Sequence, residues 1–204
     1  MKYTNEQIRQ ISKAMDDIEY FAENFVSINH PVHGLTSIRL NDFQKQVIRD
    51  FTSKKIFFTP GPRQKGKTTI AAIILLHQAL FHQYRVSLVF ARTKVMSNAI
   101  IEIITNMYDN LPEFMQMSSL TTRNKSKIVF ENSCSIISAG ANTDYGRGRA
   151  VSNIYIDESE WFDKLDEVMT SLYPCMATIP YSKIFSLSST HTGATLKYYG
   201  FEVA

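Results

Sequence analysis

The sequence predicts an α/β fold, in which a mostly parallel sheet carries helices on both faces. Short runs rich in aromatic and β-branched residues alternate along the chain with longer runs whose apolar residues recur at helical spacing. A glycine-rich loop joins the first buried run to the helix that follows it, as is common in such sheets. The chain has 204 residues, of which 44% are hydrophobic, so it can bury a substantial core.

The expected elements follow from this alternation of periods. Helices are expected over residues 1–28, 42–51, 68–81 and 94–108, and after Trp161. Strands are expected over residues 55–59, 86–91, 153–156 and 184–187, and a hairpin over residues 127–138. The stretch at residues 29–34 contains Pro and Gly and ends the first helix.

The composition limits where the protein works. The net charge is only +3, so any contact with DNA must come from local basic patches rather than from a global field. Cys134 and Cys175 lack the spacing of a metal site and fit a reducing compartment. The longest apolar run, residues 70–76, is too short to span a bilayer, and the N-terminus lacks the apolar stretch of a signal peptide. We therefore expect a soluble intracellular protein.

Residues 61–69 read Gly-Pro-Arg-Gln-Lys-Gly-Lys-Thr-Thr and satisfy the P-loop pattern G-x-x-x-x-G-K-S/T at every required position. In this motif backbone N–H groups wrap a polyphosphate, Lys67 reaches the β- and γ-phosphate oxygens, and the Thr68 hydroxyl ligates Mg²⁺. The alternative is a basic surface loop that contains two glycines. The nucleotide-binding interpretation predicts contacts with ATP from Gly61, Pro62, Arg63, Gln64, Lys65, Gly66, Lys67, Thr68 and Thr69.

A second motif supplies the groups that hydrolysis needs. Residues 153–156 form an apolar run that ends in Asp157 and Glu158, which is the Walker-B arrangement. Asp157 is predicted to hold Mg²⁺, and Glu158 is predicted to polarise the attacking water as general base. Taken alone, two acids at a strand end are usually only solvated charge, and the P-loop upstream is what favours catalysis.

Gln44 is a candidate for recognition of the base. It follows Phe43 some twenty residues before the P-loop, and a Gln amide can pair with the N6 and N7 edge of adenine. The alternative places Phe43 in the core and leaves Gln44 exposed. We therefore divide the chain into an N-terminal helical segment with this adenine motif, residues 1–52, and a P-loop ATPase core, residues 53–204.

Two arginines and two hydroxyl residues complete the candidate site. Arg63 lies in the P-loop, and Arg147 lies in a glycine- and arginine-rich loop that could reach a neighbouring subunit. Either could stabilise transition-state charge as an arginine finger. A solvated basic turn or a contact with the DNA backbone is the alternative for Arg147. Ser189 and Thr190 follow the last expected strand and could sense the γ-phosphate by hydrogen bonding.

Taken in order, these blocks resemble the large terminase subunit of tailed bacteriophages, particularly its T-even-like branch. The resemblance runs from about residue 17 to residue 199. It rests on the residues 40–44, the P-loop at residues 62–69, Arg147-Gly148 ahead of Ile156-Asp157-Glu158, Leu172-Tyr173-Pro174, and Ser189-Thr190 with Gly193. It implies a RecA-like ATPase domain of the additional-strand (ASCE) type, which pumps double-stranded DNA into a prohead.

The resemblance also implies roles for the candidate residues. Gln44 would contact adenine, Lys67 and Thr68 the phosphates and Mg²⁺, Asp157 the Mg²⁺ and Glu158 the water. Arg63 would act in cis and Arg147 in trans within a homo-oligomeric ring. Ser189 and Thr190 would couple hydrolysis to movement. The implied partners are double-stranded DNA, the portal protein of the prohead and the small terminase subunit, in the host cytoplasm and transiently at the portal vertex, with no membrane.

The length of the chain differs from the family pattern. Chains of this family continue into a lid-like subdomain and a nuclease domain, so we expect a truncated or split product without nuclease activity of its own. Two other functions stay open at this point. One is a DExx helicase-like DNA translocase, and the other is a catalytically silent nucleotide-binding assembly module.

Overall fold

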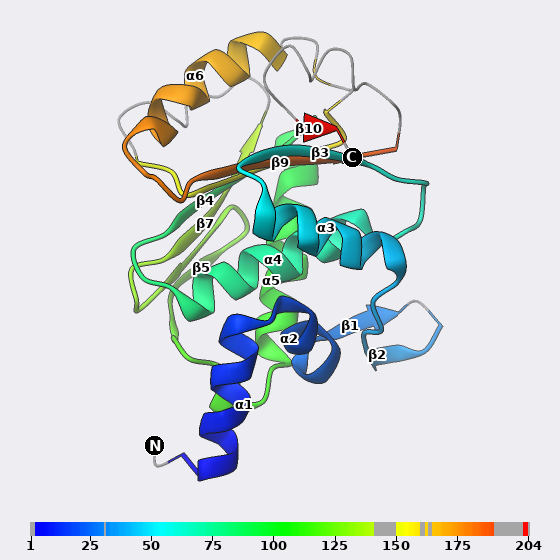
Figure 1. The fold of residues 1–204 in the computed structure, drawn as a ribbon, viewed down its shortest axis with the longest axis vertical. Helices are drawn as coiled ribbons and strands as arrows, with labels where there is room; N and C mark the ends of the chain where they lie inside the picture. The colour runs from blue at the N-terminus through cyan, green and yellow to red at the C-terminus, as the bar shows by residue number, and fades with distance from the viewer. Residues whose placement is uncertain are drawn as a thin grey trace.

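The computed structural model describes residues 3–30, 32–140, 150–159, 162, 165–189 and 202–203. Within them, a sheet of eight strands lies between two layers of helices (Figure 1). The helices are α1 (Asn5–Asp16), α2 (Ile18–Phe25), α3 (Asp42–Ser53), α4 (Lys67–Phe81), α5 (Lys94–Asp109) and α6 (Leu165–Ala177), with a 3₁₀ turn at Glu113–Met115. The strands are β1 (Ser27–His30), β2 (Gly34–Ser37), β3 (Ile56–Pro60), β4 (Val86–Ala91), β5 (Leu120–Asn124), β6 (Lys127–Phe130), β7 (Ser135–Gly140), β8 (Asn153–Asp157), β9 (Lys183–Ser188) and β10 (Glu202–Val203).

The expected single helix over residues 1–28 is wrong. Asp17 takes an extended backbone conformation, ends α1 and caps α2 by accepting a hydrogen bond from the N–H of Tyr20 at 2.9 Å. An Asp side chain that satisfies a free N–H is a common way to begin a helix, so it splits an otherwise continuous apolar stripe. Ser27–His30 and Gly34–Ser37 then pair as the antiparallel hairpin β1–β2, where the sequence predicted only a break.

The large sheet has the strand order β10-β3-β9-β8-β4-β7-β6-β5. Every neighbouring pair from β10 to β7 is parallel, and β6 and β5 close the edge as an antiparallel meander. The expected hairpin at residues 127–138 is therefore confirmed as β6–β7, whereas β5 was missed. Its residues after Leu120 are exposed, and a polar, exposed edge strand carries little of the alternation that marks a strand.

One strand separates the two motifs. β9 lies between β3, which leads into the P-loop, and β8, which ends in Asp157. This is the additional strand that the predicted fold class requires, and it confirms that class. The register pairs Pro60 with Ser188 and Asp157 with Leu187, so the three loops that follow these strands begin side by side. Ligands of open α/β sheets bind outside this carboxyl edge.

Two hydrophobic cores hold the layers together. On one face of the sheet α4 is buried along almost its whole length, because α2, α3 and α5 pack around it, and α1 packs on α2. On the other face α6 packs on the sheet through Met169 and Leu172 (Figure 1). A helix that is apolar all round must lie in a core, and this central position fixes where α4 begins. Within the described residues, no helix combines the length and the hydropathy that crossing a bilayer requires.

Candidate functional site

The P-loop is a tight turn between the end of β3 and the start of α4. Gly61 donates its N–H to the carbonyl of Ser188 at 2.9 Å, which fastens the loop to β9. Gln64 and Gly66 have φ angles of 63° and 70°, in the left-handed region. Gly66 is the N-cap of α4, and it makes no side-chain capping bond to the N–H groups of the first turn. Such N–H groups, together with the helix dipole, attract anions, as a phosphate site requires.

The first turn of α3 supports this loop from behind. A Cβ atom added to Gly61 would lie 2.3 Å from the ring of Phe43, and one added to Gly66 would lie 2.5 Å from Nε2 of Gln44. Gln44 donates from Nε2 to the carbonyl of Gly66 at 3.3 Å, and Asn41 donates from Nδ2 to the carbonyl of Lys65 at 3.3 Å. The two glycines of the motif are therefore required by α3 as well as by a ligand.

The structure contradicts the alternative that left the Gln44 side chain exposed. Its side chain is only 4% exposed, so an exposed Gln44 is wrong. Its Oε1 accepts the backbone N–H of Asn41, while its own N–H bonds the Asn41 side chain, so the two residues form the capping box of α3. A short polar residue followed three positions later by Gln is the signal of such a box, and it was present in the sequence. Contact of Gln44 with adenine stays a prediction.

Lys67 lies at the centre of the site. Its ammonium group, on a side chain that is 7% exposed, is 3.5 Å from Oε1 of Glu158. The same group donates to the carbonyl oxygens of Gly61 at 3.4 Å and Pro62 at 3.1 Å, and to the hydroxyl of Ser189 at 3.4 Å. A buried charge is tolerated only when it is paired and hydrogen-bonded, and all these partners come from loops at the carboxyl edge.

Glu158 faces Lys67 from the end of β8. Its φ of 47° is left-handed, which is uncommon for a residue with a side chain and typical of a constrained functional position. Its carboxylate accepts hydrogen bonds from the N–H and the hydroxyl of Ser189, both at 2.7 Å. The structure thus brings together three predicted residues: Lys67 at the start of α4, Glu158 after β8 and Ser189 after β9.

Asp157 and Thr68 are joined through a residue that the sequence motifs did not single out. The hydroxyl of Tyr155, which is fully buried, donates to Oδ1 of Asp157 and also shares a hydrogen bond with the Thr68 side chain. Residues two apart on a strand share a face, so the position of Tyr155 before Asp157 was the available signal. One carboxylate and one hydroxyl suit Mg²⁺, which needs few protein ligands when phosphates and water supply the rest.

Burial changes the acidity of this carboxyl group. The pKa of Asp157 is raised from 3.8 to about 6, chiefly because the group is removed from water; the Tyr155 hydroxyl and Lys67 oppose the rise, and the negative charge of Glu158 contributes to it. A bound divalent cation would favour the ionised form of this group. Within the described residues, no group of three or more His, Cys, Asp or Glu side chains could hold a metal ion by itself. The donor set therefore fits a magnesium ion that arrives with a phosphate ligand.

The other predicted residues fall into three sets. Pro62, Arg63, Gln64 and Lys65 lie in the exposed part of the P-loop, and Thr69 lies in the first turn of α4. Arg147 and Thr190 lie outside the described residues. Asp50 of α3 was not predicted at all, although it is 2% exposed and accepts from the Thr59 hydroxyl at 2.9 Å while pairing with Lys54 at 3.1 Å. It fastens α3, and with it the support of the P-loop, to β3.

A family model described as "Terminase large subunit, T4likevirus-type, N-terminal" matches residues 59–174, more than half of the chain. The chain belongs to this family. The match includes the P-loop, Asp157 and Glu158, so it rests on the same segments as the geometry above. The resemblance found in the sequence is confirmed.

Solved structures share the fold at low identity. The large terminase of the HK97 bacteriophage matches with a TM-score of 0.67 at 18% identity, over 85% of this chain and 37% of that one. A large terminase of the thermophilic bacteriophage D6E, in complex with ADP, matches with a TM-score of 0.59 at 9% identity, over 81% and 45%. The UvsW helicase of bacteriophage T4 matches with a TM-score of 0.65 at 12% identity, over 93% and 66%.

These likenesses show a RecA-like P-loop fold. This terminase-family chain spans between 37% and 66% of the length of the structures it matches. The activity of those longer proteins as a whole can therefore only be proposed for this chain.

Proposed function

We propose that this domain binds Mg²⁺–ATP at the P-loop and hydrolyses it. The observation that supports this most strongly is the meeting of Lys67, Glu158 and Ser189, with the Lys67 ammonium 3.5 Å from a Glu158 oxygen and 3.4 Å from the Ser189 hydroxyl. A cation for the phosphates, a carboxylate for the water and a hydroxyl between them are the groups that phosphoryl transfer to water requires. Family membership and the ADP complex of a related fold support the same activity.

The residues then divide the work of hydrolysis. When the nucleotide binds, the Lys67 ammonium leaves the carbonyls of Gly61 and Pro62 and contacts the β- and γ-phosphate oxygens. The backbone N–H groups of loop 61–66 then cradle the polyphosphate. Glu158 accepts a proton from the attacking water as the bond from the γ-phosphorus to the bridging oxygen breaks, which releases ADP and phosphate. Thr68 and Asp157 would hold Mg²⁺, which would neutralise charge on the phosphate oxygens.

We further propose that this hydrolysis drives double-stranded DNA into a prohead, the role that the terminase family suggests. In such a motor Arg63 would act in cis, and Arg147 would act on the site of a neighbouring subunit in a ring of identical subunits. Ser189 and Thr190 would couple the loss of the γ-phosphate to movement of the rest of the chain. Ser189 suits that role because it already contacts both Lys67 and Glu158. The portal protein and the small terminase subunit are the expected partners, at the portal vertex in the host cytoplasm.

Phosphate release tests the catalytic proposal. We expect Glu158→Gln to keep its affinity for ATP but to lose roughly 10²–10⁴-fold in hydrolysis rate, since it removes the general base. The matched control is Glu102→Gln, on an exposed position of α5, which should hydrolyse ATP at the wild-type rate. If the wild-type chain binds ATP yet releases phosphate no faster than Glu158→Gln, the domain is a silent nucleotide-binding module.

A helicase-like translocase is the second candidate. It is favoured by the UvsW match, which covers 93% of this chain. Strand separation on a forked duplex by the wild-type chain, absent with Glu158→Gln, would support it over packaging. ATP-dependent movement on duplex DNA without strand separation would support the packaging motor.

A further inference from the structure

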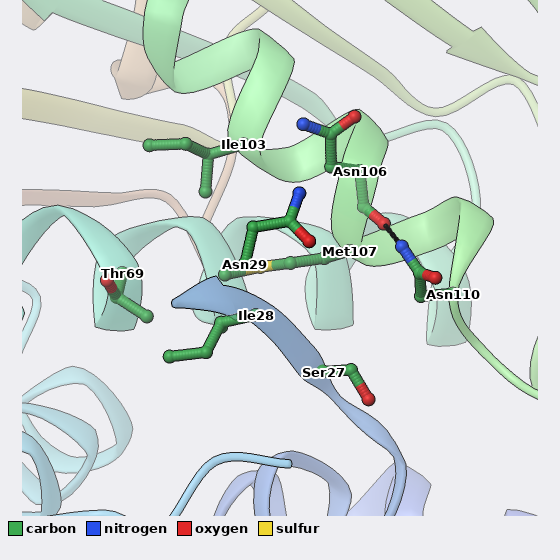
Figure 2. A pocket seen from close by; sticks show the side chains of 8 residues that line it. All are labelled: Ser27, Ile28, Asn29, Thr69, Ile103, Asn106, Met107 and Asn110. Carbon is green, nitrogen blue, oxygen red and sulfur yellow. Dashed lines mark hydrogen bonds between the residues drawn. The ribbon is translucent and has the colours of Figure 1, made fainter. Parts of the chain in front are cut away.

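A pocket of about 160 Å³ lies beside the P-loop, between β1, the first turn of α4 and α5 (Figure 2). Thr69 of α4 lines it, so this pocket adjoins the candidate nucleotide site. A separate group of side chains lies at the opposite edge of the sheet, where the parallel strands β3, β9, β8 and β4 begin. Two cations lie at this amino edge, Arg85 just before β4 and Lys183 at the start of β9.

The guanidinium group of Arg85 is half-buried and held in one orientation. Its Cζ lies 4.6 Å from the centre of the Tyr181 ring, which is a cation–π contact. Its Nη1 donates to Oε1 of Gln78, and within the described residues this is the one hydrogen bond of the guanidinium. A guanidinium carries five N–H donors in a fixed fork that matches the oxygens of a phosphate or a carboxylate. The two contacts therefore fix the fork and leave other N–H groups of it to a ligand.

The turn that carries Arg85 is rigid because Asn132 holds it. Nδ2 of Asn132 donates to the carbonyls of Ala79 at 2.7 Å and His82 at 2.8 Å. The carbonyl of Asn132 accepts the backbone N–H of Tyr84 at 3.1 Å. The backbone at Tyr84 has a φ of 57°, in the left-handed region, which a residue with a side chain keeps only where its surroundings fix it. Arg85 therefore enters the sheet in a preorganised position.

Lys183 places a second charge on the same face of the sheet. The register pairs Ser87 with Asn153, and Asn153 with Lys183. Arg85 continues the ladder of β4, because its carbonyl accepts the N–H of Ser135 at 2.9 Å, and it lies two residues before Ser87 on the same face. Neighbouring strands are about 4.8 Å apart, so β4 and β9 lie roughly 10 Å apart across β8. Asn153, on the strand between the two cations, is uncharged.

Among the described residues, neither cation forms an ion pair. The ammonium of Lys183 donates only to carbonyls there, of Thr52 at 3.4 Å and Lys54 at 2.7 Å. Asp50, in the last turn of α3, pairs with Lys54 at 3.1 Å instead. Burial lowers the pKa of Arg85 and of Lys183, and the charge of Arg85 contributes to the shift of Lys183. A bound anion would offset both the burial and the repulsion of these charges.

A chain of phosphates suits this pair of cations better than a single carboxylate. Each phosphate brings its own negative charge, and its oxygens match the fork of an arginine. A single carboxylate brings one charge and cannot serve two cations on strands that another strand separates. Duplex DNA and free polyphosphate both present successive phosphates.

We propose that Arg85 and Lys183, with the Tyr181 ring as support, form a second phosphate-binding site at the amino edge of the sheet, opposite the P-loop. Its ligand is a chain of phosphates, which either the backbone of duplex DNA or a free polyphosphate supplies. The site contains no residue of the P-loop or of the Walker-B motif, so its test does not depend on the proposed hydrolysis of ATP.

Binding of a short labelled duplex, followed by fluorescence anisotropy, tests the first source. We expect Arg85→Gln to bind it about tenfold more weakly than the wild type, and the log–log dependence on salt to become shallower by about 0.9 for each lost phosphate contact. Lys183→Gln should behave likewise, since Gln can still donate to the carbonyls of Thr52 and Lys54 but carries no charge. The matched control is Arg9→Gln, exposed on α1, which removes the same charge elsewhere and should bind as the wild type does.

A local signal tests the second source, because tripolyphosphate is also expected to bind at the P-loop. The Nε–Hε resonance of Arg85 in the NMR spectrum can be identified by its loss in Arg85→Gln. If DNA is the source, this resonance should shift when the duplex is added. If a free polyphosphate is the source, it should shift with tripolyphosphate and not with the duplex. Thermal melting of each variant shows that it is folded.

A saturable shift of the Arg85 resonance with either ligand, weakened in Lys183→Gln, supports the site. No shift with either ligand overturns it, whether or not the chain hydrolyses ATP. If Arg9→Gln loses as much duplex affinity as Arg85→Gln, net charge explains the binding and the site is overturned. An equal shift of the Arg85 resonance with poly-glutamate also overturns it, because the amino edge would then fit an acidic protein segment.

Discussion

The two ends of α4 bury an ionisable side chain in opposite ways. At its start Lys67 is 7% exposed and is surrounded by two carbonyls, a hydroxyl and the Glu158 carboxylate. Near its end His77 is 3% exposed and packs against the rings of Phe21 and Phe81. The pKa of His77 is lowered from 6.5 to about 4, chiefly by burial; the hydrogen bond to Ala14 opposes the shift, and the charges of His82 and Arg85 contribute to it. One end keeps a charge in place, and the other excludes it.

The backbone conformation also differs between the two ends of α4. Gln64, Gly66 and Glu158, all close to Lys67, have positive φ angles. His77 lies inside a regular helix and donates from Nε2 to the carbonyl of Ala14 at 2.9 Å, which joins α4 to α1. Strained backbone and buried charge cost stability, and they persist where surrounding structure holds them for function. The first end of α4 is therefore a site, and the second end is a structural joint.

The largest effect should come from removing the charge at the first end. Lys67→Ala takes away the only side chain of the P-loop that is both buried and cationic in the described structure. We expect ATP affinity to fall about a thousandfold, because truncating one member of a desolvated charge pair costs several kcal/mol. Calorimetric titration with Mg²⁺–ATP measures this loss. Lys55→Ala, exposed before the start of β3, should bind ATP with wild-type affinity and serves as the control. Retained ATP affinity in Lys67→Ala would show that the two ends do not differ in function.

The second end of α4 should make the stability of the folded chain depend on pH. The pKa of His77 is lower in the folded chain, about 4, than its ordinary value of 6.5, so between these values the unfolded chain binds more protons. Stability is therefore fully present above pH 6.5 and is lost as the pH falls toward 4, by about 3 kcal/mol in total. Urea unfolding at several pH values measures this slope.

His77→Gln should flatten the slope without changing binding of ATP at pH 7.5. Gln can still donate to the carbonyl of Ala14 but takes up no proton in this range. The slope that remains belongs in part to His82, whose pKa is also lowered to about 4, by burial and then by Arg85. An unchanged slope in the double variant His77→Gln/His82→Gln would contradict the assignment of acid sensitivity to this end of α4.

The sequence predicted the functional residues at the start of α4 better than the structural contacts near its end. The spacing of Gly61, Gly66 and Lys67 is local, and so is the position of Asp157 and Glu158 after an apolar run. Motifs of this kind place chemistry without knowledge of the fold. The contact between His77 and Ala14 spans 63 positions in the chain, and no local pattern encodes it.

Long-range contacts also explain what was missed at the site itself. The capping role of Gln44 was readable from its spacing to Asn41, but its bond to the carbonyl of Gly66 joins residues 22 positions apart. Asp50 looks like an ordinary polar residue of an amphipathic helix, yet it is buried against Thr59. Arg147 and Thr190 lie outside the described residues, so their predicted roles stay predictions. In each case the sequence showed the type of the residue but not the partner that it contacts.

The smallest effect should sharpen the picture of the site end. Tyr155→Phe removes one hydroxyl between Asp157 and Thr68 and leaves the aromatic stacking on Phe185, whose ring centroid is 5.0 Å away. Loss of a hydrogen bond to a buried carboxyl group costs on the order of 1–2 kcal/mol, so we expect Mn²⁺, used in place of Mg²⁺, to bind the nucleotide complex about tenfold more weakly. Electron paramagnetic resonance of Mn²⁺ measures that affinity apart from turnover, and Tyr84→Phe, 72% exposed, is the control. If Mn²⁺ binds Tyr155→Phe and wild type equally, the hydroxyl only fills space, and positioning at this end of α4 depends on charged partners alone. A tenfold loss would mean that a neutral buried donor orients the metal carboxylate while Lys67 supplies the charge.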